Sequence, residues 1–192
     1  MNTSRPLILA SGSPRRKEIL ALMGLPYEVD ASDADETIEG TLSPENIVLE
    51  LSRRKALSVA PRHAGALVLA ADTIVYLDGV LGKPKTHERA VQMLSTLSGK
   101  WHDVYTGLAL VDTATGALSQ RVERTRVHFV PMTRKEIEDY AASGEPLDKA
   151  GAYGLQGMGG MFVDRIEGSH SNVIGLPMSA LRELLAQTGA AQ

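Results

Sequence analysis

The order of local patterns along the chain is the feature that most limits what it can fold into. A short apolar run at residues 7–10 is followed by Ser13-Pro14, a pair typical of a helix N-cap and first helical position. The same pair recurs at Ser43-Pro44, and the helix that starts there is expected to run to about residue 59. Because strand-like runs alternate with helical patterns, the sequence predicts an α/β fold.

The middle of the chain predicts antiparallel pairing. Residues 66–77 form an apolar run that ends at Asp78-Gly79, a hairpin turn signal. Residues 102–111 and 121–130 predict two long strands, one on each side of a turn at 113–116. A parallel-type start and an antiparallel middle together predict a mixed sheet flanked by helices, and not a purely parallel one.

Caps and glycines mark the remaining helices. Thr86 precedes apolar residues spaced i, i+3, i+4 and i+7, and Gly99 is the expected end of that helix. Thr133 and Glu136 form a capping-box pattern for a helix that ends near Gly144. The prediction is completed by a glycine-dense stretch at 151–160, a strand at 161–166 and a last helix at 177–187.

Size and charge exclude several classes of protein. The chain has 192 residues, which suits a single domain over residues 1–192, either undivided or formed of two lobes with a cleft. Its net charge of −3 argues against a binder of nucleic acid polymers, which usually carry a large basic excess. With no cysteine, the chain has no disulfide, thiol nucleophile or Cys-ligated metal. Its apolar stretches are far shorter than the ~20 residues of a membrane helix, so we expect a cytoplasmic protein without a membrane anchor.

The first candidate site joins the first strand to the first helix. It reads Ser11-Gly12-Ser13-Pro14-Arg15-Arg16 and combines two hydroxyls, two guanidinium groups and the N–H groups of a helix start. Such a set is suited to hold a phosphate. An ordinary helix cap with solvated arginines is the alternative. The segment is not a Walker loop, because the chain has no Gly-x-x-x-x-Gly-Lys-Ser/Thr pattern.

The second candidate is Asp72, which lies inside the apolar run and is followed by Thr73. A carboxylate in a buried strand is costly unless it is paired or bound to a cation. We therefore interpret Asp72 as a site residue; a surface-facing position or a satisfied buried hydrogen bond is the alternative. The Gly82-Lys83-Pro84 turn follows one hairpin later and could return Lys83 to the same edge, although alone it would be only a turn lysine.

Two charged segments are more ambiguous. The first, at residues 30–36, holds four carboxylates and usually would be a solvated loop: Asp30, Asp33, Asp35 and Glu36. One of them facing Asp72 would create a two-carboxylate site for Mg²⁺ or Mn²⁺. The second is the run Arg53, Arg54 and Lys55 on the second helix, which is typical of a wet helix face with an i, i+4 pair between Glu50 and Arg54.

The glycine-rich stretch at residues 144–157 indicates tight turns or close approach of the backbone to a ligand. Within it, Gln156 carries an amide donor and an acceptor, which suits reading a base edge. Structural turns explain most of the glycines equally well. None of the five histidines has the spacing of a metal site, so we interpret them as surface or structural residues.

Together these segments resemble the Maf family of nucleoside triphosphate pyrophosphatases, also described as septum-formation inhibitors. Seven motifs in the same order carry the resemblance, and they cover nearly the whole chain: residues 9–16, 71–73, 82–84, 97–99, 102–107, 144–157 and 167–177. The resemblance implies an elongated mixed α/β fold similar to the inosine triphosphate pyrophosphatases. It also implies a cytoplasmic, metal-dependent enzyme, expected as a homodimer that acts on free nucleoside triphosphates.

The resemblance further implies a reaction and its residues. The triphosphate would be split between its α- and β-phosphates, with Asp72 as general base beside Mg²⁺ or Mn²⁺ held by Asp72 and Glu36. Positive charge from Lys55 and Lys83 would offset the triphosphate, which would be gripped by four residues of the first candidate site: Ser11, Ser13, Arg15 and Arg16. Thr73 and Gln156 would read the base. Arg15, Thr73 and Gln156 match the dTTP/UTP branch, whereas the 7-methyl-GTP branch typically has Trp, Gln and Glu at these places.

Two other functions remain open from the sequence. The first is a nucleotide-binding regulator of cell division that does not turn over its ligand. The second is a pyrophosphatase of the same class for modified nucleotides such as 7-methyl-GTP. Release of pyrophosphate from dTTP separates the first from an enzyme, and a panel of triphosphates separates the second from a dTTP/UTP pyrophosphatase.

Overall fold

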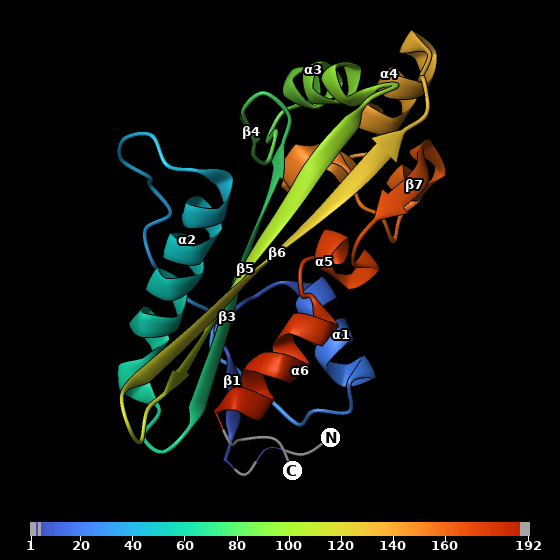
Figure 1. Cartoon of the computed structure of the whole chain (residues 1–192). Helices are drawn as coiled ribbons and strands as arrows, with labels where there is room; N and C mark the ends of the chain where they lie inside the picture. Colours follow the sequence, from blue (N-terminus) through green and yellow to red (C-terminus); the bar gives the residue numbers. More distant parts are fainter. Residues whose placement is uncertain (1–2, 4, 189–192) are drawn as a thin grey trace. The chain divides into compact units, whose positions relative to one another are not determined.

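The computed structural model describes residue 3 and residues 5–188 of the chain (Figure 1). The chain divides into two compact units: residues 1–72, 106–123 and 175–192 form the first, and residues 73–105 and 124–174 form the second. Three long strands contribute residues to both units, and their bounds are β3 (Leu67–Tyr76), β5 (Trp101–Asp112) and β6 (Ala117–Phe129).

The sheet is mixed, as the sequence predicts. Among the described residues its strand order is β2-β1-β3-β5-β6-β7, with β4 paired to β3. The outer and short strands are β1 (Leu7–Leu9), β2 (Glu28–Val29), β4 (Val80–Leu81) and β7 (Val163–Glu167). β1 pairs in parallel with β2 and β3, whereas β3–β4 and β6–β7 are antiparallel. β5 and β6 are neighbours joined by residues 113–116, and so short a link requires antiparallel strands.

The first unit contains three long helices, α1 (Pro14–Leu22), α2 (Pro44–Val59) and α6 (Met178–Gln187), and a 3₁₀ turn, η1 (Ala60–Arg62). Part of its core lies between α2 and the strands, where apolar side chains from β1, β3 and β5 meet Ala56 and Val59. In α2 the Ser43 side chain accepts a hydrogen bond from the Asn46 N–H, and Pro44 occupies the first turn. The predicted cap therefore fixes where this helix begins.

The second unit contains α3 (His87–Leu97), α4 (Arg134–Ala142) and α5 (His170–Ile174), with three 3₁₀ turns: η2 (Glu145–Asp148), η3 (Ala150–Ala152) and η4 (Met158–Phe162). Helices α3 and α4 lie side by side (Figure 1). Their core includes a ring cluster in which Phe129 contacts Tyr153 at 4.8 Å and Tyr140 contacts Phe162 at 5.4 Å between centroids. The capping box of Thr133 and Glu136 is present at the start of α4.

The structure differs from the predicted elements at several positions, and the strand predicted at 121–130 begins earlier, at Ala117. The predicted strand at 161–166 begins at Val163, because Met161 and Phe162 belong to η4. The short elements β2 and α5 were not predicted. Within residue 3 and residues 5–188, none of the helices combines the length and apolar character that a bilayer crossing requires.

Candidate active site

A lysine between two carboxylates forms the centre of the candidate site in the first unit. Lys55 Nζ lies 2.5 Å from Oδ1 of Asp72 and 2.7 Å from Oε1 of Glu36. The Lys55 and Asp72 side chains are only 13% and 11% exposed, whereas Glu36 is 60% exposed. One ammonium group thus holds a buried and a solvent-facing carboxylate at the same point.

Three elements of the first unit bring these groups together. Asp72 is on β3, where the six residues 67–72 are all buried, and Lys55 is the cation in direct contact with its carboxylate. Lys55 is on α2, whose buried face includes Val48 and Ala56. Glu36 lies in the connection between β2 and α2.

A close approach fixes α2 on the sheet. A Cβ atom at Gly107 on β5 would lie 2.3 Å from the Val48 carbonyl oxygen and 2.9 Å from the Leu49 nitrogen. Any larger residue at this position would push α2 away from the strand. Gly107 thus determines how deeply the helix that carries Lys55 packs.

The candidate phosphate-binding segment, residues 11–16, begins where β1 ends. β1 runs parallel to β3, with Leu9 opposite Leu69. The two strands therefore point the same way, and the residues that follow Leu9 lie at the same end of the sheet as Asp72, three residues after Leu69. Ser11 is buried, and its Oγ accepts hydrogen bonds from Arg16 Nη1 at 3.0 Å and from the Ser13 N–H at 3.3 Å.

Arg16 is held from a second side, because its Nε donates to the Gly175 carbonyl oxygen at 2.9 Å. Burial lowers the pKa of the Arg16 guanidinium, and the charge of Asp72 opposes that effect. Because an arginine stays protonated in proteins, Arg16 supplies a fixed positive charge in the field of Asp72. Arg15 precedes it on the first turn of α1 and is half-buried.

Ser13 is the N-cap residue of α1, as predicted, but within the described helix its side chain makes no capping hydrogen bond. Its hydroxyl therefore differs from those of Ser43 and Thr86, which accept hydrogen bonds from the N–H groups of Asn46 and Arg89. The first turn of α1 retains backbone N–H groups suited to an anion.

The acidic segment resolves into separate roles. Asp30 pairs with Arg62 at 2.8 Å and with His63 at 2.8 Å, and Asp35 accepts a hydrogen bond from the Thr37 N–H. Glu36 is the member that contacts Lys55. In the basic run, Arg54 pairs with Glu50 as predicted, and Arg53 does so as well. Lys55 does not lie on the solvated face predicted for this run, because it points from α2 toward Asp72.

Three predicted site residues belong to the second unit. Thr73 is half-buried on β3, and both Lys83 and Gln156 are exposed. The turn that carries Lys83 is tied to the glycine-rich stretch, since the Gly151 N–H donates to the Gly82 carbonyl oxygen and the Lys85 N–H donates to the Leu147 carbonyl oxygen. Lys83 and the stretch that carries Gln156 are therefore parts of one hydrogen-bonded assembly.

The family of the chain follows from comparison with known proteins. The family described as Maf-like protein matches residues 6–188. The chain belongs to the Maf family. A relative from Desulforamulus reducens, named dTTP/UTP pyrophosphatase, is 48% identical over 186 residues, which are 96% of this chain and 97% of the relative. A relative from Bacillus cereus (strain AH820) with the same name is 50% identical over 182 residues, 94% of either chain.

The structural likeness supports the same fold class. The structure of a HAM1 protein from Coxiella burnetii superposes on this Maf chain with a TM-score of 0.57. It covers 97% of this chain and 100% of the other at 19% sequence identity, so the likeness concerns the fold alone.

Glu36 and Asp72 are the two carboxylates of this Maf chain that could hold a divalent cation. Glu36 and Asp72 converge on one ammonium group, which shows that both carboxylates can face a single positive charge. Among the described residues no group of three or more His, Cys, Asp or Glu side chains is placed to hold a metal. Two carboxylates match Mg²⁺, which is commonly bound by one or two carboxylates together with substrate phosphates.

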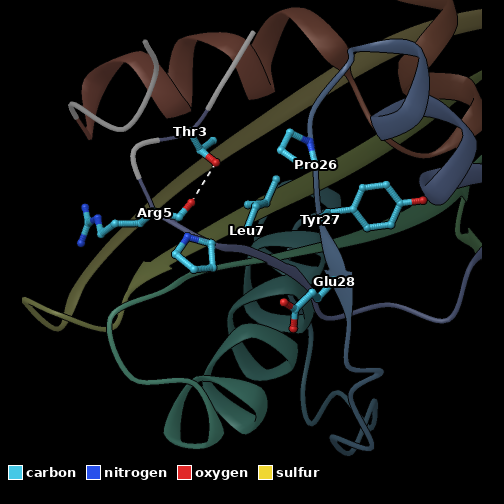
Figure 2. A pocket seen from close by; sticks show the side chains of 7 residues that line it. Thr3, Arg5, Leu7, Pro26, Tyr27 and Glu28 are labelled. Atoms are coloured by element: carbon cyan, nitrogen blue, oxygen red, sulfur yellow. Dashed lines mark hydrogen bonds between the residues drawn. The ribbon is translucent and has the colours of Figure 1, made fainter.

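An open pocket elsewhere in the first unit has a different lining. It measures about 410 Å³ and is bordered by residues up to the start of β1 and by residues that lead into β2: Thr3, Arg5, Pro6, Leu7, Pro26, Tyr27 and Glu28. Figure 2 shows the Thr3 hydroxyl directed at the Arg5 carbonyl oxygen, a hydrogen bond of 2.8 Å. These lining residues include none of the predicted site residues, so this hollow is separate from the Lys55 centre.

The sequence interpretation assigned no role to Gly107 and no partner to His102. Gly107 sits inside a strand pattern, and a glycine there signals a bulge or a close approach of another backbone. His102 is 3% exposed and its Nε2 lies 2.9 Å from the Tyr153 hydroxyl, so this histidine is structural, as interpreted from its spacing. The sequence offered a signal for the glycine but none for the partner of His102.

Proposed function

We propose that the chain hydrolyses dTTP and UTP to the nucleoside monophosphate and pyrophosphate. The observation that carries the proposal is the Lys55 ammonium between Asp72 and Glu36, in the unit where Ser11 and Arg16 form the polar segment before and at the start of α1. The names of relatives that are 48% and 50% identical over nearly the whole chain support the reaction and the substrates.

The residues of the first unit suit an in-line displacement at the α-phosphorus. Asp72 takes a proton from the attacking water, whose oxygen forms the new bond to the α-phosphorus. The bond from that phosphorus to the bridging oxygen breaks, and pyrophosphate leaves with the electron pair. Arg15 and Arg16, with the hydroxyls of Ser11 and Ser13, bind phosphate oxygens, and Lys55 offsets charge as it develops.

A divalent cation completes this assignment. Glu36 and Asp72 would hold Mg²⁺ or Mn²⁺, which when bound supplies charge neutralisation at the phosphates. The proposed roles in the second unit are neutralisation of phosphate charge by Lys83 and recognition of the pyrimidine by Thr73 and Gln156. The exposed amide of Gln156 can both donate to and accept from a base edge.

The proposal extends to the setting in which the protein works. We propose that it is a cytoplasmic homodimer that meets free triphosphates and not a nucleic acid polymer, in keeping with a net charge of −3 and no cysteine. Sedimentation velocity of the purified chain tests the dimer, and a species with the mass of one chain at micromolar concentration would refute it.

A substrate panel tests the reaction. Pyrophosphate release is measured with Mg²⁺ and with Mn²⁺ for dTTP, UTP, CTP, GTP and 7-methyl-GTP. The proposal expects the highest kcat/KM for dTTP and UTP and no release without added metal. Tight dTTP binding without release would instead indicate a regulator, and activity confined to 7-methyl-GTP would place the chain in the other branch.

A further inference from the structure

The strongest unexplained arrangement is around Glu145 in the second unit. Glu145 is the first residue of η2, and its carboxylate accepts three hydrogen bonds. Oε1 accepts from the Tyr140 hydroxyl at 2.8 Å and from the Gly159 N–H at 3.2 Å, while Oε2 accepts from the Met158 N–H at 2.9 Å. One side chain thus binds the backbone on the C-terminal side of Gln156.

Tyr140 binds the other side of the same segment. Its side chain is buried on α4, and its hydroxyl accepts a hydrogen bond from the Gly154 N–H at 3.2 Å. Tyr140 and Glu145, which we name the Glu145–Tyr140 clamp, therefore hold the backbone both before and after Gln156. The Gln156 side chain itself is exposed.

The glycines of this segment leave room for the clamp. A Cβ atom at Gly157 would lie 2.5 Å from the Glu145 carboxylate oxygens, and one at Gly159 would lie 2.4 Å from the Tyr140 hydroxyl oxygen. Contacts under 3.0 Å force something to move. The turn interpretation of these two glycines is therefore incomplete: a side chain at Gly157 would displace the Glu145 carboxylate, and one at Gly159 would meet the Tyr140 hydroxyl and the Gly154 backbone.

The protonation states agree with these hydrogen bonds. Burial raises the pKa of the Glu145 carboxyl, but hydrogen bonds from Met158, Tyr140 and Gly159 outweigh it, and the pKa is lowered overall. Burial, together with the hydrogen bond to Glu145, raises the pKa of the Tyr140 hydroxyl. At neutral pH the tyrosine donates and the carboxylate accepts, which is a charge-assisted hydrogen bond.

From these contacts we infer that the Glu145–Tyr140 clamp sets base selectivity by fixing the backbone from which Gln156 reaches the base. The inference rests on the proposed role of Gln156 in reading the pyrimidine. Glu145 and Tyr140 are positioning residues: they bind the backbone that carries Gln156. The Gln156 amide can recognise a base only when its donor and its acceptor both face their partners on the base edge. A shift of the backbone that carries Gln156 should therefore reduce discrimination between bases before it reduces hydrolysis.

Selectivity measurements test the clamp. The kcat and KM for dTTP and for CTP are measured for the wild type, Gln156→Ala, Glu145→Gln, Tyr140→Phe and the double variant of Gln156→Ala with Glu145→Gln. Tyr140→Phe removes only the hydroxyl and keeps the ring that packs on Phe162. The matched control is Glu138→Gln on α4, the helix that carries Tyr140. The Glu138 carboxylate pairs with the exposed Arg134. Melting temperatures confirm that each variant is folded at the assay temperature.

The expected result is a drop of roughly tenfold in the dTTP-to-CTP ratio of kcat/KM for Glu145→Gln and Tyr140→Phe, with a smaller change in kcat. Adding Glu145→Gln to Gln156→Ala should change the ratio no further, since both act through one side chain. If Gln156→Ala lowers the ratio but the clamp variants keep the wild-type ratio, the inference is wrong and the proposed role of Gln156 stands. If Gln156→Ala leaves the ratio unchanged, the proposed role of Gln156 is wrong, and the inference falls with it.

Discussion

The Lys55 ammonium and the Asp72 carboxylate lie 2.5 Å apart, with both side chains almost completely withdrawn from solvent. The same ammonium contacts Glu36 at 2.7 Å. A buried carboxylate is costly to the folded state unless a cation accompanies it. The pair therefore couples the stability of the first unit to its proposed chemistry, because changing either residue alters both.

Replacing Asp72 by Asn should remove the general base and lower kcat for pyrophosphate release by roughly 10²–10⁴-fold. The amide is nearly isosteric, so the circular dichroism spectrum should stay that of the wild type. Asp139→Asn is the matched control, since Asp139 forms an exposed pair with Lys135 at 2.6 Å. Near-normal release by the Asp72 variant would refute the assigned role.

Replacing Lys55 by Met should lower both stability and turnover. The buried Asp72 carboxylate loses its cation, which costs about 3 kcal/mol in the free energy of unfolding. Urea denaturation measures this cost, and the exposed Lys135→Met variant should lose well under 1 kcal/mol. If Lys55→Met unfolded at the wild-type urea concentration, another charge such as that of Arg16 would compensate the Asp72 carboxylate, and the stabilising role assigned to Lys55 would be wrong.

Replacing Gly107 by Ala should destabilise the first unit by about 1–3 kcal/mol, because the new Cβ meets the Val48 carbonyl oxygen of α2. Turnover should fall as well, since α2 carries Lys55. Gly79→Ala is the control: a Cβ there meets nothing within 4 Å. Equal melting temperatures for the two variants would show that α2 does not depend on the close approach.

The His102 side chain should make the protein sensitive to mild acid. Burial lowers its pKa from 6.5 to about 4, against the opposing charge of Asp103, so the folded protein keeps this histidine neutral. Between these two values the unfolded chain binds a proton that the folded chain does not. Stability contributed by neutral His102 is therefore complete above pH 6.5 and is lost as the pH falls toward 4, by about 3 kcal/mol in total.

Chemical denaturation at pH 7 and pH 4.5 measures that loss. His102→Gln should show a smaller difference between the two pH values than the wild type, whatever its absolute stability. The exposed His87→Gln variant should keep the wild-type difference. If His87→Gln instead removed the loss of stability at pH 4.5, the acid sensitivity would come from the exposed His87 and not from His102.

Local signals made most of the fold predictable. Helix starts at Ser43, Thr86 and Thr133 are marked by caps, which act within three residues and do not depend on distant partners. The strand β2 (Glu28–Val29) has no such signal: two exposed residues are ordered by pairing with Ile8 and Leu9 of a distant strand. Helix α5 (His170–Ile174) is likewise too short for a periodic pattern.

The sequence predicted part of the candidate site and left its tertiary contacts undetermined. Asp72 stands out because a carboxylate interrupts an apolar run, and that conflict is visible in the sequence. The residue pattern does not show which acid of the 30–36 segment meets Lys55, since the connection has no repeat; only the family resemblance named Glu36. The clamp on Gln156 was equally hidden, because it depends on a tyrosine sixteen positions earlier reaching past the glycines.

The glycine spacing around Gln156 also limits how this enzyme can be redesigned. Side chains at Gly154, Gly157, Gly159 and Gly160 would each meet another atom at 2.7 Å or less. Variation in a library built to alter nucleotide preference belongs instead at residues 155, 156 and 158, where side chains already exist and the backbone is unaffected. Side chains at Gly159 and Gly160 would displace backbone atoms and should destabilise the loop, whereas those at Gly154 and Gly157 would meet only the side chains of Lys149 and Glu145.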